Sequence, residues 1–148
     1  MSFYDVSATG VSIFIKSSVS FPTGFFVEGM ADDTDPLGFS EMTVAEADTN
    51  ANGDLVVWGK PHVLTPKLAV VAGSPADDNL QIMLAARENG VREEVEMTVT
   101  YPDGSSVTAS EGVLTTGTKG KTVSSAGRTA TRSYGFAFGT HSELRAVR

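Results

Sequence analysis

Three aspartates within the stretch DDTDP form an acidic group that could bind a divalent cation: Asp32, Asp33 and Asp35. Carboxylate oxygens are the ligands that Ca²⁺ and Mg²⁺ prefer. A calcium loop of the EF-hand type beginning at Asp32 would need glycine at its sixth position and glutamate at its twelfth, where the sequence has Leu37 and Thr43. We therefore interpret Asp32–Asp35 as a solvated turn, and a calcium- or carbohydrate-binding loop is the alternative.

The remaining reactive side chains do not form a recognisable catalytic set. Glu94 and Glu96 share one face of a predicted strand, roughly 7 Å apart, and such a pair can serve as acid and base, although solvated glutamates are far more common. A histidine metal site would need both His62 and His141, which lie far apart in the sequence, together with carboxylates. The GTKGKT stretch at 117–122 lacks the helix that follows a phosphate-binding P-loop. The sequence therefore predicts no enzyme and no cofactor.

Segments in which apolar and polar residues alternate make up most of the chain. They predict strands at 10–21, 24–30, 41–48, 55–60, 62–73, 91–101, 106–117 and 128–139. Asn52-Gly53 is a strong hairpin signal between two of these strands, and residues 31–40 read as a polar loop. Pro66 predicts that the strand at 62–73 is an edge or bulged strand. Strands separated by turns at roughly ten-residue intervals predict a mainly β protein, an antiparallel sandwich or barrel.

One helix, at about 74–89, interrupts the strand pattern and has both ends marked. Ser74 is a suitable N-cap, and Pro75 stands at the first helical position, where its missing N–H costs nothing. Asp77 and Asp78 place negative charge at the positive end of the helix dipole. An apolar stripe along the helix is expected to pack on the sheet, and it consists of Ala76, Leu80, Met83 and Leu84.

Charge is unevenly distributed along the 148 residues, whose net charge is −7. Residues 1–100 carry fifteen acidic and five basic side chains, a balance of −10, whereas residues 101–148 carry three acidic and six basic ones, a balance of +3. The negative total argues against nucleic-acid binding through phosphate neutralisation. The uneven charge has two interpretations that stand equally: chance and solvation alone, or two faces of opposite sign that meet head to tail between copies and so form rings or filaments.

Length and apolar content predict a single domain over residues 1–148, with extended arms at 1–9 and 140–148. No run of eighteen apolar residues exists, and the first residues lack the pattern of a secretory signal, so we expect no membrane anchor. The absence of cysteine fits folding in a reducing cytoplasm.

The ordered segments ADDTDP, NGDLVVW, VVAGSPADDNLQIML, TVTYPDG, SSAGR and SYGFAF resemble those of bacteriophage tail tube proteins, over roughly residues 10–140. The most specific piece is the opening of the helix, where Ser-Pro and Asp-Asp follow a strand and a small-residue turn. The resemblance implies a β-sandwich or barrel with one flanking helix, related in architecture to the tubes of type VI secretion systems and pyocins. It implies a structural virion protein without catalytic activity.

The resemblance also implies partners and a location. Six copies would form a ring, and stacked rings would form a tube through which DNA passes during ejection without specific binding. The expected partners are the protein itself, a sheath if the tail contracts, and baseplate and tail terminator proteins. The expected location is the virion tail, assembled in the cytoplasm of the host bacterium. A tube subunit, a tube initiator and a terminator remain alternatives.

Two sets of residues are candidates for these roles. An acidic or neutral channel wall lets DNA slide, and the lumen-facing candidates are Glu94, Glu96, Thr98, Thr100, Glu41 and Thr43, although these faces fit the outer surface nearly as well. Acidic loops could meet a basic loop between stacked rings, and the candidates for these contacts are Asp32, Asp33, Asp35, Asp48, Asp54, Lys119, Lys121 and Arg128.

Overall fold

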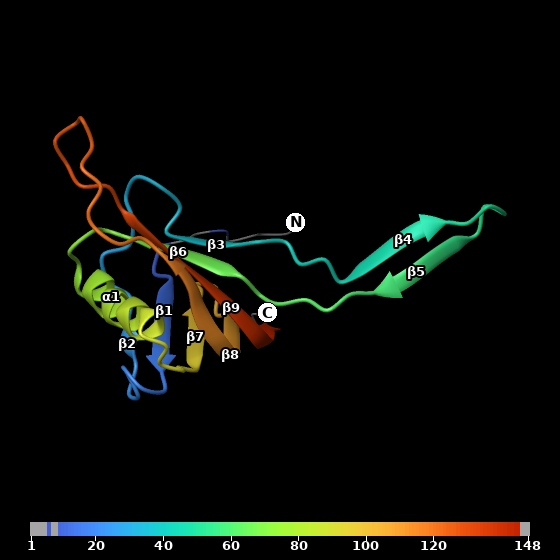
Figure 1. Ribbon diagram of the computed structural model, residues 1–148, viewed down its shortest axis with the longest axis horizontal. Coiled ribbons are helices and arrows are strands. Elements are labelled where there is room, and N and C mark those ends of the chain that lie inside the picture. The colour runs from blue at the N-terminus through green and yellow to red at the C-terminus, as the bar shows by residue number, and fades with distance from the viewer. Residues whose placement is uncertain (1–5, 7–8, 146–148) are drawn as a thin grey trace.

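Strands dominate the computed structural model, which describes residue 6 and residues 9–145 (Figure 1). The elements in this part of the chain are β1 (Ser12–Ser17), β2 (Phe25–Phe26), β3 (Leu37–Phe39), β4 (Ala45–Thr49), β5 (Leu55–Gly59), β6 (Pro66–Val70), α1 (Pro75–Glu88), β7 (Val95–Thr100), β8 (Ser106–Gly117) and β9 (Arg132–Leu144). Buried side chains alternate with less buried ones in β1, β7 and the first half of β9, as a half-buried sheet requires.

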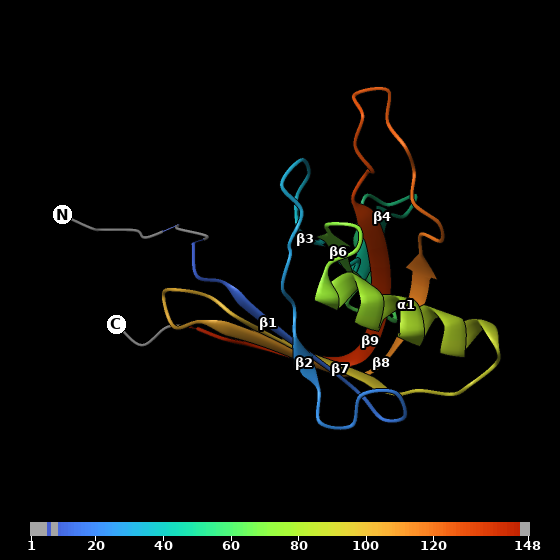
Figure 2. The same cartoon turned by 90° about the vertical axis from the view of Figure 1, so that its left-hand side faces the viewer.

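Seven strands form one antiparallel sheet in the order β2-β1-β7-β8-β9-β6-β3, whereas β4 and β5 pair with each other in a separate hairpin. The large sheet curls, and α1 lies against its inner side (Figure 2). The predicted fold class, a mainly β antiparallel sandwich or barrel with one flanking helix, is thus confirmed in the form of a curled half-barrel.

A bulge in β8 contributes to the curl of the sheet. The pairing between β7 and β8 shifts register at this point, and Glu111 adopts a positive φ of 52°. Bulges of this kind bend a strand and increase its twist. Gly112 follows, and a Cβ atom at this position would lie 2.1 Å from the Phe138 ring, so the ring fills the space that a side chain would need.

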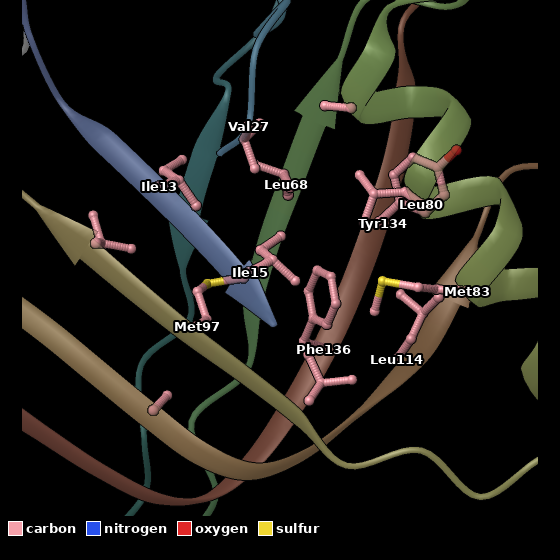
Figure 3. Close-up of a cluster of buried hydrophobic side chains, with 14 of the residues drawn as sticks. Ile13, Ile15, Val27, Leu68, Leu80, Met83, Met97, Leu114, Tyr134 and Phe136 are labelled. Atoms are coloured by element: carbon pink, nitrogen blue, oxygen red, sulfur yellow. The ribbon is translucent and has the colours of Figure 1, made fainter. Parts of the chain in front are cut away.

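The core lies between the inner side of the sheet and α1 (Figure 3). Its largest fully buried side chains are Tyr134, Phe136, Phe138, Ile13, Ile15, Leu68, Leu80, Met83, Met97, Val70, Val95 and Val99. The alternation predicted for β7 is confirmed, because Val95, Met97 and Val99 are buried while the residues between them are not.

The helix has the predicted ends. The Ser74 hydroxyl accepts a hydrogen bond from the Asp77 amide at 3.3 Å, and Pro75 begins the helix. The predicted apolar stripe faces the sheet, since Ala76, Leu80 and Met83 are buried and Leu84 packs beside them.

Several predicted strand positions are wrong. The segment 24–30 contributes only the two residues of β2, and the predicted polar loop 31–40 contains the edge strand β3. β6 is not an edge, because β9 and β3 flank it. Pro66 is tolerated there as the first residue of its strand, where it lies opposite Phe39 near a sheet edge.

The predicted terminal arms are described only in part. β9 continues to Leu144, so residues 140–144 belong to the sheet rather than to a separate arm. The remainder of these two predicted arms, at 1–5, 7–8 and 146–148, lies outside the described residues.

Candidate functional site

One face of the large sheet carries mainly hydroxyl side chains. Because paired residues of neighbouring strands share a face, the residues that alternate with Met97 and Val99 define the side of the sheet opposite the core. Phe14 and Leu144 also lie on this side, opposite Thr98 and Ser106. We call its serine and threonine side chains the hydroxyl face: Ser12, Thr98, Thr100, Ser106, Thr108, Ser110, Thr140 and Ser142. Hydroxyls exchange hydrogen bonds with water, and none of these eight residues is basic.

Charged residues border the hydroxyl face on β1 and before β7. Lys16 lies opposite Glu96 in register, and both line a shallow depression together with Ser18 and Glu94. Glu94 precedes β7, and its amide donates to the Ser18 hydroxyl at 3.0 Å. The structure therefore brings Glu94, Glu96, Thr98 and Thr100 to one side of the sheet, although Glu94 is not part of the strand.

Glu41 and Thr43 do not belong to this surface. The strand predicted at 41–48 begins only at Ala45, and both residues are exposed in the segment that joins β3 to β4. They were expected on an alternating strand face, but that segment makes no strand pairing at residues 41–43.

The loops at 31–36 and 118–131 project from the same end of the molecule (Figures 1 and 2). The Arg128 guanidinium donates to both carboxylate oxygens of Asp32, at 3.2 Å and 3.1 Å. These hydrogen bonds and the positive charge of Arg128 lower the pKa of Asp32 below its ordinary value. Asp32 and Arg128, predicted to meet across stacked rings, thus pair within one chain. Asp33 and Asp35 are exposed on the same loop.

The other stacking candidates are distributed over two distant regions. Lys119 pairs with Glu88 of α1, and Lys121 lies in the same loop as Arg128. Asp48 and Asp54 lie instead in the hairpin of β4 and β5, where they accept hydrogen bonds from the Thr49 amide and the Asn50 side chain. Contacts of these residues between copies remain a prediction.

The hairpin of β4 and β5 projects away from the rest of the structure (Figure 1). We call residues 45–59 the arm, and every residue in its two strands is exposed. Residues paired in register share a face, so one face of the arm carries Ala45, Ala47, Thr49, Leu55, Val57 and Gly59. The other face carries Glu46, Asp48, Val56 and Trp58. We call the first of these the apolar face of the arm.

An isolated two-stranded hairpin is at best marginally stable in water. The arm has local support at its turn, where the Asn50 side chain accepts from the amides of Asn52 and Asp54 at 3.0 Å and 2.9 Å. At its base, Lys60 forms an ion pair with Glu46 at 2.9 Å. Its exposed apolar face nevertheless lacks a packing partner within the described part of the chain, which makes the arm a candidate contact surface.

A buried polar network joins the start of α1 to β9. The Asp77 carboxylate accepts from the Tyr134 hydroxyl at 2.7 Å and from the Gly73 amide at 2.9 Å, and it pairs with Arg132 at 3.2 Å. Gln81 donates to the Tyr134 oxygen and to the carbonyl of Thr118. The sequence indicated a helix-dipole role for Asp77 but not its distant partners.

Burial, reinforced by the hydrogen bond to Asp77, raises the pKa of Tyr134 to about 12 from its ordinary value of 10.0. Because the folded pKa is the higher one, the neutral phenol stabilises the fold below pH 10, and this contribution is lost as pH rises towards 12. We expect the free energy of unfolding of Tyr134→Phe to fall less steeply above pH 10 than that of the unsubstituted protein. Urea unfolding at several pH values measures this. Parallel pH dependences for the two proteins would contradict this.

The described residues contain no group of three or more His, Cys, Asp or Glu side chains placed to hold a metal ion. Within residue 6 and residues 9–145, no helix has the length and apolar character needed to cross a bilayer. The candidate functional sites are two extended surfaces, the hydroxyl face and the arm.

Comparison with known proteins identifies a matching family and several solved structures with a similar fold. The profile of the family described as Tail fiber protein gp32 matches residues 4–142. No curated protein matches the sequence.

Three solved structures illustrate the similarity of fold. A chain from the anti-feeding prophage cap, titled as the AFP tube terminating cap, has a TM-score of 0.65 at 9% identity, covering 99% of this chain and 95% of that one. The sheath/tube terminator of PVC, an extracellular contractile injection system, in its extended state has a TM-score of 0.60 at 8% identity, covering 97% and 99%. A chain of the six-fold symmetrised anti-feeding prophage baseplate has a TM-score of 0.58 at 13% identity, covering 97% of both chains. At these identities the likeness shows a shared fold.

Proposed function

This chain belongs to the tail fiber protein gp32 family and is a tail-related protein, and on that premise we propose that it is a structural subunit of a phage tail tube. In this proposal six copies form a ring, rings stack into a tube, and DNA passes through the channel during ejection. The subunit acts by assembling, and it carries out no catalysis.

The hydroxyl face is the observation that carries this proposal. Duplex DNA carries about one negative charge per 1.7 Å of its axis, so a basic wall would retain it. A wall of serine and threonine side chains offers hydrogen bonds to water. Its border carries Glu94, Glu96 and Lys16, two carboxylates and one cation, and so has little attraction for phosphate. The curled sheet presents the hydroxyl side chains side by side on four strands, as a channel wall requires.

The comparisons support the proposal at the level of fold. The similar structures are titled as a tube-terminating cap, a sheath/tube terminator and a six-fold symmetrised baseplate. Expected partners are further copies of this chain, a sheath if the tail contracts, and baseplate and terminator proteins. The expected location is the tail of the virion, after assembly in the host cytoplasm.

A terminal ring is the second candidate function. The first two similar structures, with TM-scores of 0.65 and 0.60, are titled as terminators. A terminator forms one ring and stops, whereas a tube subunit continues to stack as its concentration rises. A calcium or carbohydrate module is less favoured, since Arg128 already engages both carboxylate oxygens of Asp32.

Negative-stain electron microscopy of the purified full chain over a range of concentrations tests the proposal. Hollow tubes that lengthen with concentration are the expected result. Single rings of constant height would favour the terminal ring, and monomers at every concentration would contradict self-assembly.

The channel assignment is tested on the same assemblies by chemical labelling, since the chain has no cysteine of its own. Thr98→Cys on the hydroxyl face is expected to react with a small maleimide but poorly with a bulky polymer-linked one. Ile82→Cys is the matched control, because Ile82 is 53% exposed on α1, on the other side of the sheet. Equal reaction of Thr98→Cys with both reagents in intact tubes would contradict the channel assignment.

A further inference from the structure

The two edges of the large sheet carry different surfaces. At one edge, β2 and β1 bring Phe26 and Phe14 together with ring centroids 4.9 Å apart, and Phe26 is 62% exposed. At the other edge, the arm emerges between β3 and β6. The molecule therefore has an exposed Phe26 packed on a half-buried Phe14 at one end of its sheet and an exposed apolar hairpin at the other.

The aromatic pair is fixed in place before any partner binds. Phe14 pairs in register with both Phe26 and Thr98, so the two rings lie at the border of the hydroxyl face. A Cβ atom at Gly24 would lie 2.3 Å from Cζ of Phe14, which means that the Phe14 ring packs directly on the Gly24 backbone. A rigid apolar surface of this kind binds a partner at a low entropic cost.

The apolar face of the arm has matching properties. Leu55 and Val57 are 68% and 58% exposed, and they lie on the same side of the hairpin with the small residues of β4. Small alanines on one strand and larger side chains on the other leave a surface against which flat aromatic rings can pack.

Charged residues lie near both apolar surfaces. Lys16 lies two residues from Phe14 on the same face, and the arm carries Asp48 and Asp54 near its turn. None of these three residues belongs to an ion pair in the described part of the chain. An acidic hairpin tip that approaches the β2 edge of another copy would meet Lys16 together with Glu94 and Glu96, so the contact between copies rests on the apolar match.

We propose that the apolar face of the arm of one copy packs on the Phe14–Phe26 pair of the next copy in the ring. Contact between different surfaces at opposite edges of one sheet is heterologous, and such contacts close into rings when the rotation allows. The inference rests on the proposed function, because the ring supplies the second copy. It also gives both exposed apolar surfaces a partner and covers the β2 edge.

Disulfide trapping tests this contact, and no cross-link can arise from native cysteines because the chain contains none. The variant Phe26→Cys/Val57→Cys is assembled at high concentration, oxidised mildly and separated on a denaturing gel. We expect a ladder of covalent oligomers that collapses to monomer on reduction. The matched control is Phe26→Cys/Val56→Cys, in which the second cysteine lies on the opposite face of the arm and should give at least fivefold less cross-linked product.

Each other outcome has a distinct meaning. Tubes or rings without a ladder overturn the docking inference but leave the proposed function intact. Failure of the unsubstituted chain to assemble overturns both. Covalent dimers from Val57→Cys alone would show that arms pair with each other, and equal ladders from the two double variants would show non-specific contact, so either result overturns the inference.

Discussion

Replacing Asp77 by alanine is expected to lower the free energy of unfolding by about 3–5 kcal/mol, the usual effect of removing one partner from a buried ion pair. Asp77 is 1% exposed, and its carboxylate lies at the centre of the network that joins α1 to β9. Its removal leaves the Tyr134 hydroxyl, the Gly73 amide and the Arg132 guanidinium without their acceptor.

Arg132 accounts for most of the expected loss. Its side chain is 10% exposed, and its Nε atom already has no hydrogen-bond partner in the described structure. Without Asp77 the guanidinium would be an uncompensated charge in a site that excludes water. The double variant Asp77→Ala/Arg132→Met should therefore recover part of the stability, because it removes both charges together.

Urea unfolding followed by circular dichroism measures this effect on the dilute protein. A loss of 3–5 kcal/mol corresponds to a fall in Tm of roughly 6–20 °C for a domain of this size. Asp78→Ala is the matched control, since Asp78 is exposed in the same helical turn and should cost only about 0.3–1 kcal/mol through the helix dipole. Equal losses from the two variants would contradict the role assigned to the buried network.

The same helix shows what the sequence can and cannot predict. Its limits follow from local chemistry, because Ser74, Pro75 and Gly90 act within one turn of the helix ends. The binding partners of Asp77 cannot be read in this way, since Arg132 and Tyr134 lie more than fifty residues further along the chain. Alternation in β9 is enough to put these two side chains on one face of the strand, and that face is buried. It contains no information about which residue of α1 they meet.

The arm shows a second limit of local patterns. Asn52-Gly53 and the flanking strands predicted a hairpin, and the hairpin is present. Its predicted place among the strands of the sandwich is wrong, because pairing between β4 and β5 is local whereas docking on the sheet needs long-range contacts. The apolar residues at 55–58 are all exposed, which is the pattern expected of a segment that is buried by another copy.

Substitution of Val57 by glutamate is expected to raise the concentration needed for assembly by at least about a hundredfold. Full burial of one valine contributes about 1.5–3 kcal/mol, and a buried carboxylate costs several kcal/mol more, while each 1.4 kcal/mol changes an association constant tenfold. Val57 is 58% exposed, so the same change should alter the stability of the dilute subunit by less than about 1 kcal/mol.

Val56→Glu is the matched control, because Val56 precedes Val57 and points to the opposite face of the arm. Both variants place one charge on β5. Because Val56 lies opposite Asp48 and Val57 lies opposite Ala47, Val56→Glu should weaken the hairpin itself at least as much as Val57→Glu. Sedimentation velocity over a concentration series measures assembly, and thermal unfolding of the dilute proteins measures subunit stability. Only docking of the apolar face would make Val57→Glu assemble less well than Val56→Glu. Equal assembly by the two variants would therefore mean that the apolar face of the arm is not buried between copies.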